Sequence, residues 1–291
     1  TAITFACTLF GIDRQVYYRK IKRRFNKQNK ARLVVDIVLG IRHQMPRIEA
    51  RKLYYLLGND LKTLKIGWDK FIDILRANHL LIVPKRSYHI TTNSHHRFRK
   101  YNNQLLDLEI NRPEQVWVSD ITFIGKREKP CYLSLITDAY SKKIVGYNVS
   151  DNLNTESSLV ALRLAINQRK NKDLVLIHHS DRGLQYCANE YQKLLSKNRI
   201  KPSMTQNSDP YENAVAERIN GILKQEFNID KYHKDLPIMK QIIKETVQIY
   251  NEKRPHYSNH MLTPNQIHQH SKLHIQTYKT KNTCKNVLAR V

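Results

Sequence analysis

Three acidic residues, Asp120, Asp181 and Glu217, occupy positions where the surrounding sequence makes a carboxylate noteworthy. Asp120 lies inside a run of β-branched and aromatic residues, where aspartate is disfavoured and a buried charge is costly. Asp181 comes at the end of an apolar run, the strand-end position where open α/β sheets place their binding sites. Glu217 lies about 200° around a predicted helix from Val215, so it points away from the apolar stripe of that helix. The three acids are therefore candidates for one shared site.

The chemistry that these acids could support is metal-dependent phosphoryl transfer. Taken singly, each acid has a structural explanation: Asp120 as half of a buried ion pair, Asp181 as a turn or cap residue, and Glu217 as a solvated helix acid. Carboxylate oxygens without cysteine suit Mg²⁺ or Mn²⁺ rather than zinc. Two such ions about 3.5 to 4 Å apart can activate an attacking oxygen and stabilise a leaving oxygen. Acting together, the three acids would suit two Mg²⁺ ions, with Mn²⁺ able to substitute, while the separate structural explanations stay open at this point.

Two further polar residues share the predicted helix face of Glu217. Asn213 precedes Glu217 by four positions and Lys224 follows it by seven, so both fall within about 40° of it. One face of this helix therefore presents an amide, a carboxylate and an ammonium group.

The charge balance indicates a polyanionic partner. The chain has 50 Lys and Arg residues against 25 Asp and Glu residues, a net charge of +25 among 291 residues. The excess is spread along the chain, so nucleic acid is the first expected partner, and a basic but inert surface is the plainer alternative. No stretch approaches the roughly 20 consecutive apolar residues of a membrane span, and the first ten residues lack the order of a signal peptide. We therefore expect a cytoplasmic protein without membrane contact.

The segment after Pro113 is predicted to form an α/β domain. Short runs rich in β-branched and aromatic residues predict three hairpin-linked strands, and alternating helices and strands follow them. The predicted strands are 116–124, 131–137, 144–149, 174–177 and 200–204, and the predicted helices are 155–168, 189–197 and 211–227. This order describes a mixed sheet flanked by helices, the arrangement of an RNase H-like fold.

The part of the chain before Pro113 is predicted to be helical and basic. A short apolar helix, a turn at Gly11 and a second helix capped by Asp13 outline a partial helix-turn-helix. Helical spacing of apolar residues then predicts a small DNA-binding helical domain, followed by a basic linker that lies along DNA. The predicted divisions are 1–30 for the helix-turn-helix, 31–83 for the helical domain, 84–113 for the linker, 114–270 for the catalytic core and 271–291 for a basic tail.

Several sequence blocks resemble, in the same order, those of the OrfB class of insertion-sequence transposases, within the Asp-Asp-Glu transposase and retroviral integrase superfamily. The 35 residues between Asp181 and Glu217 also fit that superfamily. The matching blocks are Trp117-Val118-Ser119-Asp120-Ile121-Thr122, His179-Ser180-Asp181-Arg182-Gly183, Asp209-Pro210-Tyr211-Glu212-Asn213-Ala214, Leu223-Lys224, Arg254-Pro255-His256 and Thr263-Pro264. The chain departs from the family pattern in two places: Glu49 replaces a frequent glycine, and Arg218-Ile219-Asn220 replaces a serine-aromatic-aromatic run.

This resemblance implies a DNA transposase with an RNase H-like catalytic core. Such an enzyme hydrolyses DNA at the ends of its element to free a 3′-OH, which then attacks another phosphodiester without a covalent protein intermediate. Lys224 would grip terminal DNA, and Asn213 would support the metal-bound glutamate or a phosphate. Further DNA contacts are expected from the basic residues Arg14, Arg97, Arg99, Arg182 and Arg254 and from His256.

The resemblance also implies partners and leaves two rival functions. Two element ends and a target must be held together, which favours a homo-oligomer on double-stranded DNA. Members of this class are often joined by frameshifting to an upstream helix-turn-helix and leucine-zipper segment, which is a candidate second partner. The expected location is the bacterial cytoplasm, in association with the nucleoid. A catalytically retired DNA-binding regulator and an RNase H-like nuclease without joining activity are the alternatives.

Overall fold

The computed structural model describes residues 2–83, 101–105, 108–126, 129–205, 213–232 and 235–269. These residues belong to two compact units, Thr1–Lys85 and Arg86–Val291. Most of the predicted linker, the predicted tail and the expected DNA contacts Arg97 and Arg99 lie outside the described residues. Within the described ranges, no helix is long and apolar enough to cross a membrane.

The first unit is helical, as the sequence predicted. Its described helices are α1 (Ala2–Leu9), α2 (Arg14–Gln44), α3 (Ala50–Leu56), α4 (Gly58–Thr63) and α5 (Trp68–Ala77). Asp13 caps α2 by accepting a hydrogen bond from the Gln15 amide at 2.6 Å. Because no glycine or proline occurs from Arg14 to Leu39, α2 continues through residue 30, where the first predicted division was placed.

The core of the first unit forms where the second half of α2 meets the shorter helices. Val34 and Val38 from α2 are fully buried, as are Leu53 from α3 and Phe71 and Leu75 from α5. The first half of α2 contributes no buried residue, so this helix is held to its unit through its second half.

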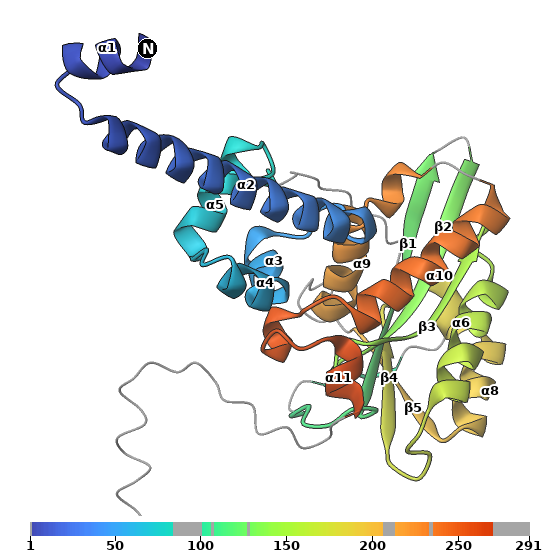
Figure 1. Ribbon diagram of the computed structural model, residues 1–291. Coiled ribbons are helices and arrows are strands. Elements are labelled where there is room, and N and C mark those ends of the chain that lie inside the picture. The colour runs from blue at the N-terminus through green and yellow to red at the C-terminus, as the bar shows by residue number, and fades with distance from the viewer. Residues whose placement is uncertain are drawn as a thin grey trace, which may run out of the picture. The chain divides into compact units, whose positions relative to one another are not determined.

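The second unit is built on a five-stranded sheet with the order β3-β2-β1-β4-β5. The strands are β1 (Val116–Lys126), β2 (Lys129–Asp138), β3 (Ile144–Ser150), β4 (Leu176–Ser180) and β5 (Ile200–Met204). The first three strands pair antiparallel as a meander, whereas β4 pairs parallel with both β1 and β5 (Figure 1). The chain therefore crosses over twice through helices, once from β3 to β4 and once from β4 to β5.

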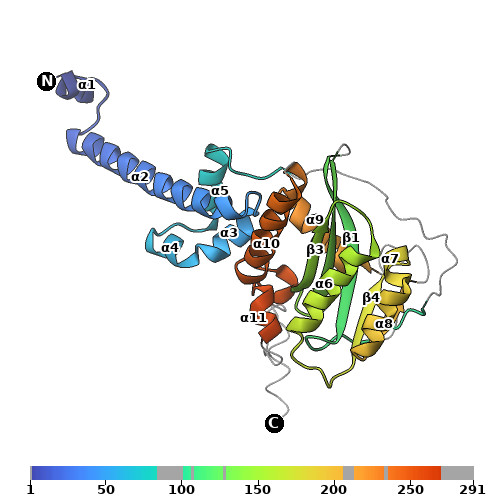
Figure 2. The same ribbon diagram turned by 90° about the vertical axis from the view of Figure 1, so that its right-hand side faces the viewer.

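Helices cover both faces of this sheet. The described helices of the second unit are α6 (Thr155–Gln168), α7 (Leu184–Cys187), α8 (Asn189–Lys197), α9 (Ala214–Glu226), α10 (Leu236–Glu252) and α11 (Pro264–Gln269), with 3₁₀ turns η2 (Ile229–Lys231) and η3 (Tyr257–Asn259). α6 and α8 lie on one face, while α9 packs on the other (Figure 2). The predicted RNase H-like mixed sheet flanked by helices is confirmed.

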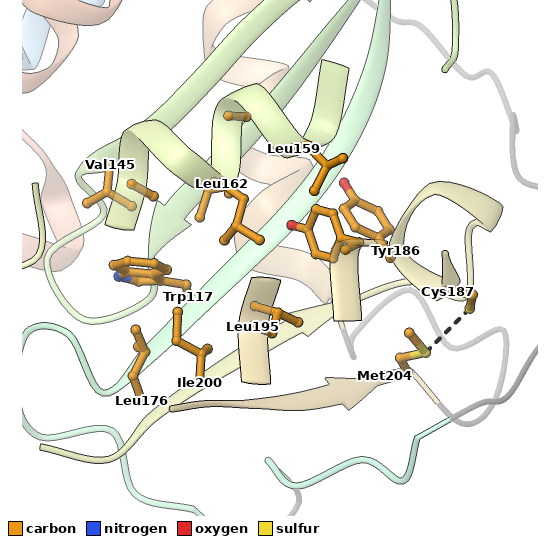
Figure 3. Packing of buried hydrophobic residues seen from close by; sticks show 14 residues of the cluster. Trp117, Val145, Leu159, Leu162, Leu176, Tyr186, Cys187, Leu195, Ile200 and Met204 are labelled. Atoms are coloured by element: carbon orange, nitrogen blue, oxygen red, sulfur yellow. Dashed lines mark hydrogen bonds between the residues drawn. The ribbon is translucent and has the colours of Figure 1, made fainter. Parts of the chain in front are cut away.

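The alternation of side chains along β1 separates the two faces. Trp117 joins the larger hydrophobic core, where it packs with Leu162 of α6 and Leu195 of α8 (Figure 3). Val116 and Val118 point to the opposite face and pack with Ala216 of α9. Asp120 has the same parity as Val118, so its carboxylate lies on the α9 side of the sheet.

The fourth strand starts and ends later than the sequence predicted. Leu174 and Val175 are exposed, and the strand runs instead from Leu176 through the two histidines to Ser180. Both histidines can be buried because hydroxyl groups bond their ring nitrogens: Ser119 and Tyr191 at His178, and Ser203 at His179.

Candidate active site

Two of the predicted acids lie close together on neighbouring parallel strands, with Asp120 in the middle of β1 and Asp181 directly after β4. The pairing of β1 with β4 matches Ser119 with Ser180, so Asp120 and Asp181 each follow directly on this last matched pair. The backbone amide of Gly183 donates to Asp181 Oδ1 at 3.0 Å, which closes the turn that ends β4. Asp181 therefore lies at the carboxyl end of β4, where the chain leaves the sheet, next to the middle of β1 that carries Asp120.

The pKa of Asp120 reflects its burial and the nearby charge of Asp181. Its pKa is raised to about 7, first because burial disfavours the charged form and then because Asp181 carries a like charge. Glu217 adds a smaller repulsion, which places the third predicted acid within range of Asp120 but coupled to it less strongly than Asp181. Glu217 itself is exposed, and partial burial raises its pKa. Asp181 is thus the acid most strongly coupled to Asp120, while Glu217 lies on the adjoining helix α9 with a weaker influence.

The polar face of α9 turns toward Asp120. Asn213 is buried at the start of α9, and its Nδ2 donates to the backbone oxygen of Ser119 at 3.2 Å. Burial lowers the pKa of Lys224, while Asp120 opposes that shift, so the ammonium group lies within electrostatic reach of Asp120. The sequence predicted this face, and the structure aligns it with β1.

One residue of the site escaped the sequence analysis. Asn220 Nδ2 donates to Asp120 Oδ2 at 2.7 Å, across 100 positions of the sequence. It sits three positions after Glu217 and seven after Asn213, which places it on the same helix face. This spacing could have placed Asn220 in the site, but in the sequence Asn220 was noted only as part of a departure from the family pattern.

A buried hydrogen-bond network supports the two strands that carry Asp120 and Asp181. His178 Nε2 contacts Ser119 Oγ at 2.6 Å and the Tyr191 hydroxyl at 2.9 Å, which links β4 to β1 and to α8. Burial, followed by the neighbouring His179, lowers the pKa of His178 to about 3, so the ring is neutral at physiological pH. The network therefore fixes the relative position of the strands without adding a charge beneath the acids.

Tyr186 and Tyr191 form a matched pair for testing this network. Both rings are buried, but the Tyr186 hydroxyl has no hydrogen-bond partner in the described part of the chain, whereas the Tyr191 hydroxyl bonds His178. We expect Tyr186→Phe to raise the free energy of unfolding by about 1 kcal/mol and Tyr191→Phe to lower it by about 1 kcal/mol. Urea unfolding of the two variants measures both shifts. Equal losses in both would show that the Tyr186 hydroxyl is bonded.

Arg182 and Arg14, two of the expected DNA contacts, have different surroundings. Arg182 directly follows Asp181, and its Nε donates to the backbone oxygen of Thr205 at 2.6 Å while the side chain stays half-buried. Arg14 belongs to the other unit, where it is exposed and its guanidinium lies 5.7 Å from the centre of the Tyr18 ring. Arg182 is thus beside the candidate site, while Arg14 lies on a separate unit.

Two other expected DNA contacts are interior residues. Arg254 is 2% exposed and pairs with Glu226, with Nη2 to Oε1 at 2.7 Å and Nε to Oε2 at 2.8 Å. His256 is also buried, and its Nε2 contacts the Tyr250 hydroxyl at 2.9 Å. Their partners link α9, α10 and the segment after α10, and either side chain would have to leave these partners to reach a phosphate, so their role as DNA contacts stays a prediction.

Within the described residues, no group of three His, Cys, Asp or Glu side chains stands at the spacing of a complete metal-ligand cluster. All three candidate ligands nevertheless carry oxygen donors, and Asp120 is crowded by like charge while it accepts hydrogen bonds from uncharged amides, the Ile121 backbone and the Asn220 side chain. A divalent cation between Asp120 and Asp181 would relieve this repulsion. The donor set therefore fits a hard cation such as Mg²⁺.

Comparison with known proteins places this site in a family. Two models described as integrase core domain match residues 110–210 and 198–264. An insertion element IS600 protein of 31 kDa from Shigella sonnei is 31% identical over 257 residues, covering 86% of this chain and 92% of that protein.

Named transposases match over shorter stretches. A putative transposase of IS986/IS6110 from Mycobacterium tuberculosis is 35% identical over 118 residues, covering 39% of this chain and 42% of its own length. Transposase InsF of IS3A from Escherichia coli is 31% identical over 146 residues, covering 50% and 49%. Among solved structures, the HTLV-2 integrase catalytic core domain in complex with magnesium is 20% identical, with a TM-score of 0.43 and coverage of 54% of this chain and 97% of that domain.

The integrase core matches span the strands and helices that gather the three acids, and the IS600 relative aligns along most of the chain. The chain therefore belongs to the insertion-sequence transposases of the Asp-Asp-Glu transposase and retroviral integrase superfamily, whose function is DNA transposition.

Proposed function

We propose that this chain cuts and joins DNA itself, with Asp120, Asp181 and Glu217 as its catalytic acids. The observation that carries the proposal is the crowding of Asp120 by Asp181 and Glu217 at the carboxyl end of β4. Carboxylates brought close together repel each other unless a cation lies between them. A retired DNA-binding regulator would have no need to retain this repulsion.

The proposed cofactor is a pair of Mg²⁺ ions, for which Mn²⁺ would substitute. Asp120 and Asp181 would share one ion, because the two are the most strongly coupled of the acids. Glu217 would complete the set from α9, where its exposed side chain is free of the packing that fixes the neighbouring apolar positions. When bound, the ions would activate the attacking oxygen and stabilise the leaving oxygen of an in-line displacement.

The proposed reaction has two steps in one site. In the first, water attacks a phosphodiester at the end of the element, and the departing 3′ oxygen takes a proton to become a 3′-OH. In the second, that 3′-OH attacks another phosphodiester, a new P–O bond forms, and the displaced oxygen takes a proton. Each step exchanges one P–O bond for another, so it requires neither an oxidant nor a covalent bond to the protein.

Basic and polar residues around the acids would position the DNA. Lys224 lies near enough to Asp120 to hold a phosphate beside the acids, and Arg182 directly follows Asp181. Asn213 would act less directly, because its Nδ2 is already bonded to the Ser119 backbone and so ties α9 to β1. Phosphate contacts of this kind position DNA without reading its sequence. Reading the element ends would be the task of the helical first unit, where Arg14 is exposed.

The net charge of +25 suits a complex with several DNA segments. We propose a homo-oligomer that holds two element ends and a target, because strand transfer needs all three together. An upstream helix-turn-helix and leucine-zipper segment is proposed as a second partner for end recognition. The place of action would be the bacterial cytoplasm, on nucleoid DNA.

The test incubates the purified chain with labelled DNA that carries both ends of the element encoding it. With Mg²⁺ we expect nicked ends and joined products that are longer than the substrate, and with EDTA we expect neither. Nicks without joined products would favour the nuclease alternative. Specific DNA binding with neither product would favour the regulator.

A further inference from the structure

Asn220 is the side chain bonded to the Asp120 carboxylate. Its Nδ2 lies 2.7 Å from Asp120 Oδ2, a distance typical of a strong hydrogen bond to a charged acceptor. Asn220 is 4% exposed, so water does not compete for this contact. When Asp120 is ionised, as a metal ligand must be, its carboxylate can only accept, so the amide has to present Nδ2 because the opposite orientation would set two oxygen atoms against each other.

The two oxygens of Asp120 are held by two different donors. Oδ1 accepts the backbone amide of Ile121 at 2.9 Å, and Oδ2 accepts Asn220. Two donors on two oxygens determine the rotation of the carboxylate plane. Each oxygen still keeps a lone-pair direction that a cation could use.

An asparagine at position 220 is unfavourable for the local stability of the chain, for two reasons. Asparagine is a poor helix former, and Asn220 lies inside α9. Its Oδ1 is buried without a hydrogen-bond partner in the described residues, which costs further stability. A residue that lowers stability in this way is a candidate for a functional role.

We propose that Asn220 is a positioning residue that holds the Asp120 carboxylate in the orientation required to bind the metal ion. It does not contact DNA or the ion, and it acts through Asp120 alone. This inference rests on the proposed metal-binding role of Asp120. It adds that the affinity for metal depends on an amide donor contributed by α9.

The first test is free of metal and of DNA. Thermal unfolding in EDTA compares the unmodified chain, Asn220→Leu, Asp120→Leu and the double variant, so that only the interaction between the two residues is isolated. We expect Asn220→Leu to lower the melting temperature when Asp120 is present, because the bond to the carboxylate is lost. When residue 120 is Leu, the same change should raise the melting temperature, because only the helix penalty and the unpaired Oδ1 are removed, so the two shifts should differ by about 4 °C. Additive shifts would show that the two side chains do not interact and would overturn the proposal.

The second test measures metal affinity directly, by following the electron paramagnetic resonance signal of free Mn²⁺ during titration of the full chain. We expect Asn220→Leu to weaken Mn²⁺ binding by about 10- to 100-fold, while Asn220→Gln, which keeps the amide donor, recovers most of the affinity. Gln225→Leu is the control, because Gln225 is exposed on the same helix. Unchanged Mn²⁺ affinity in Asn220→Leu, or an equal loss in Gln225→Leu, would overturn the positioning role.

The two tests separate this inference from the proposed function. If the unmodified chain binds Mn²⁺ but joins no DNA, the proposed strand transfer fails while the titration still decides the role of Asn220. If the unmodified chain binds no Mn²⁺, both the metal role of Asp120 and the positioning role fail together, whatever the unfolding cycle gives.

Discussion

Asp181→Asn is expected to lower the rates of both end nicking and strand joining by at least about a thousandfold. Asparagine keeps the shape of the side chain and its contact with the Gly183 amide through one oxygen, but it removes the charge beside Asp120. A divalent ion contributes several kcal/mol of transition-state stabilisation, and each 1.36 kcal/mol corresponds to a tenfold change in rate. Both steps should fall together, because water and the 3′-OH are proposed to use the same site.

The control for this variant is Asp173→Asn, which removes the same charge from an exposed position in the segment before β4. It should nick and join at the unmodified rate. Asp181→Asn should also unfold at no lower temperature than the unmodified chain, because removing a like charge relieves the repulsion on Asp120. If Asp181→Asn nicks and joins as fast as the control variant, Asp181 is not a catalytic residue.

The second large effect concerns stability rather than catalysis. Arg254→Met is expected to lower the free energy of unfolding by about 3 to 5 kcal/mol, because it leaves Glu226 without its partner in a largely buried pair. The side chains of Arg254 and Glu226 are only 3% and 18% exposed, so solvent cannot replace the lost contact fully. Replacing both residues with Met should restore much of the stability, because a well-packed apolar pair can substitute for a buried ion pair. Urea unfolding of the three variants measures this.

The alternative role of Arg254, a direct DNA contact, makes a different prediction. Loss of a phosphate contact would weaken DNA binding, reduce its salt dependence and leave stability nearly unchanged. Measuring DNA affinity at several salt concentrations alongside unfolding distinguishes the two. If Arg254→Met has normal stability but binds DNA more weakly, Arg254 contacts DNA directly.

Much of the fold could be predicted because residue periodicity is a local property. The predicted segments 155–168, 189–197 and 200–204 coincide with α6, α8 and β5, since each has clear periodicity and flanking turn residues. The fourth strand was misplaced because the apolar residues Leu174 and Val175 proved exposed. The two histidines after them are buried, which depends on hydroxyl partners from β1, α8 and β5 that no local pattern reveals.

In the candidate site, too, features set by local spacing could be predicted, whereas contacts between distant residues could not. Asp120, Asp181 and the face of α9 were accessible from the sequence, because strand ends and helical angles follow from spacing alone. The contact between Asn220 and Asp120 joins residues 100 positions apart, so it required the packing of α9 against β1. The ion pair of Arg254 has the same origin: its partner Glu226 lies 28 positions away, so no local pattern reveals it.

The most direct test of the central claim is to locate bound metal by anomalous X-ray scattering from crystals of the full chain soaked in Mn²⁺. We expect a peak between Asp120 and Asp181, on the order of 2 Å from an oxygen of each carboxylate. Asp181→Asn crystals soaked in the same way should show a peak of clearly lower occupancy. A peak elsewhere on the chain, with none between these two carboxylates, would contradict the claim that these acids form a metal-dependent catalytic site.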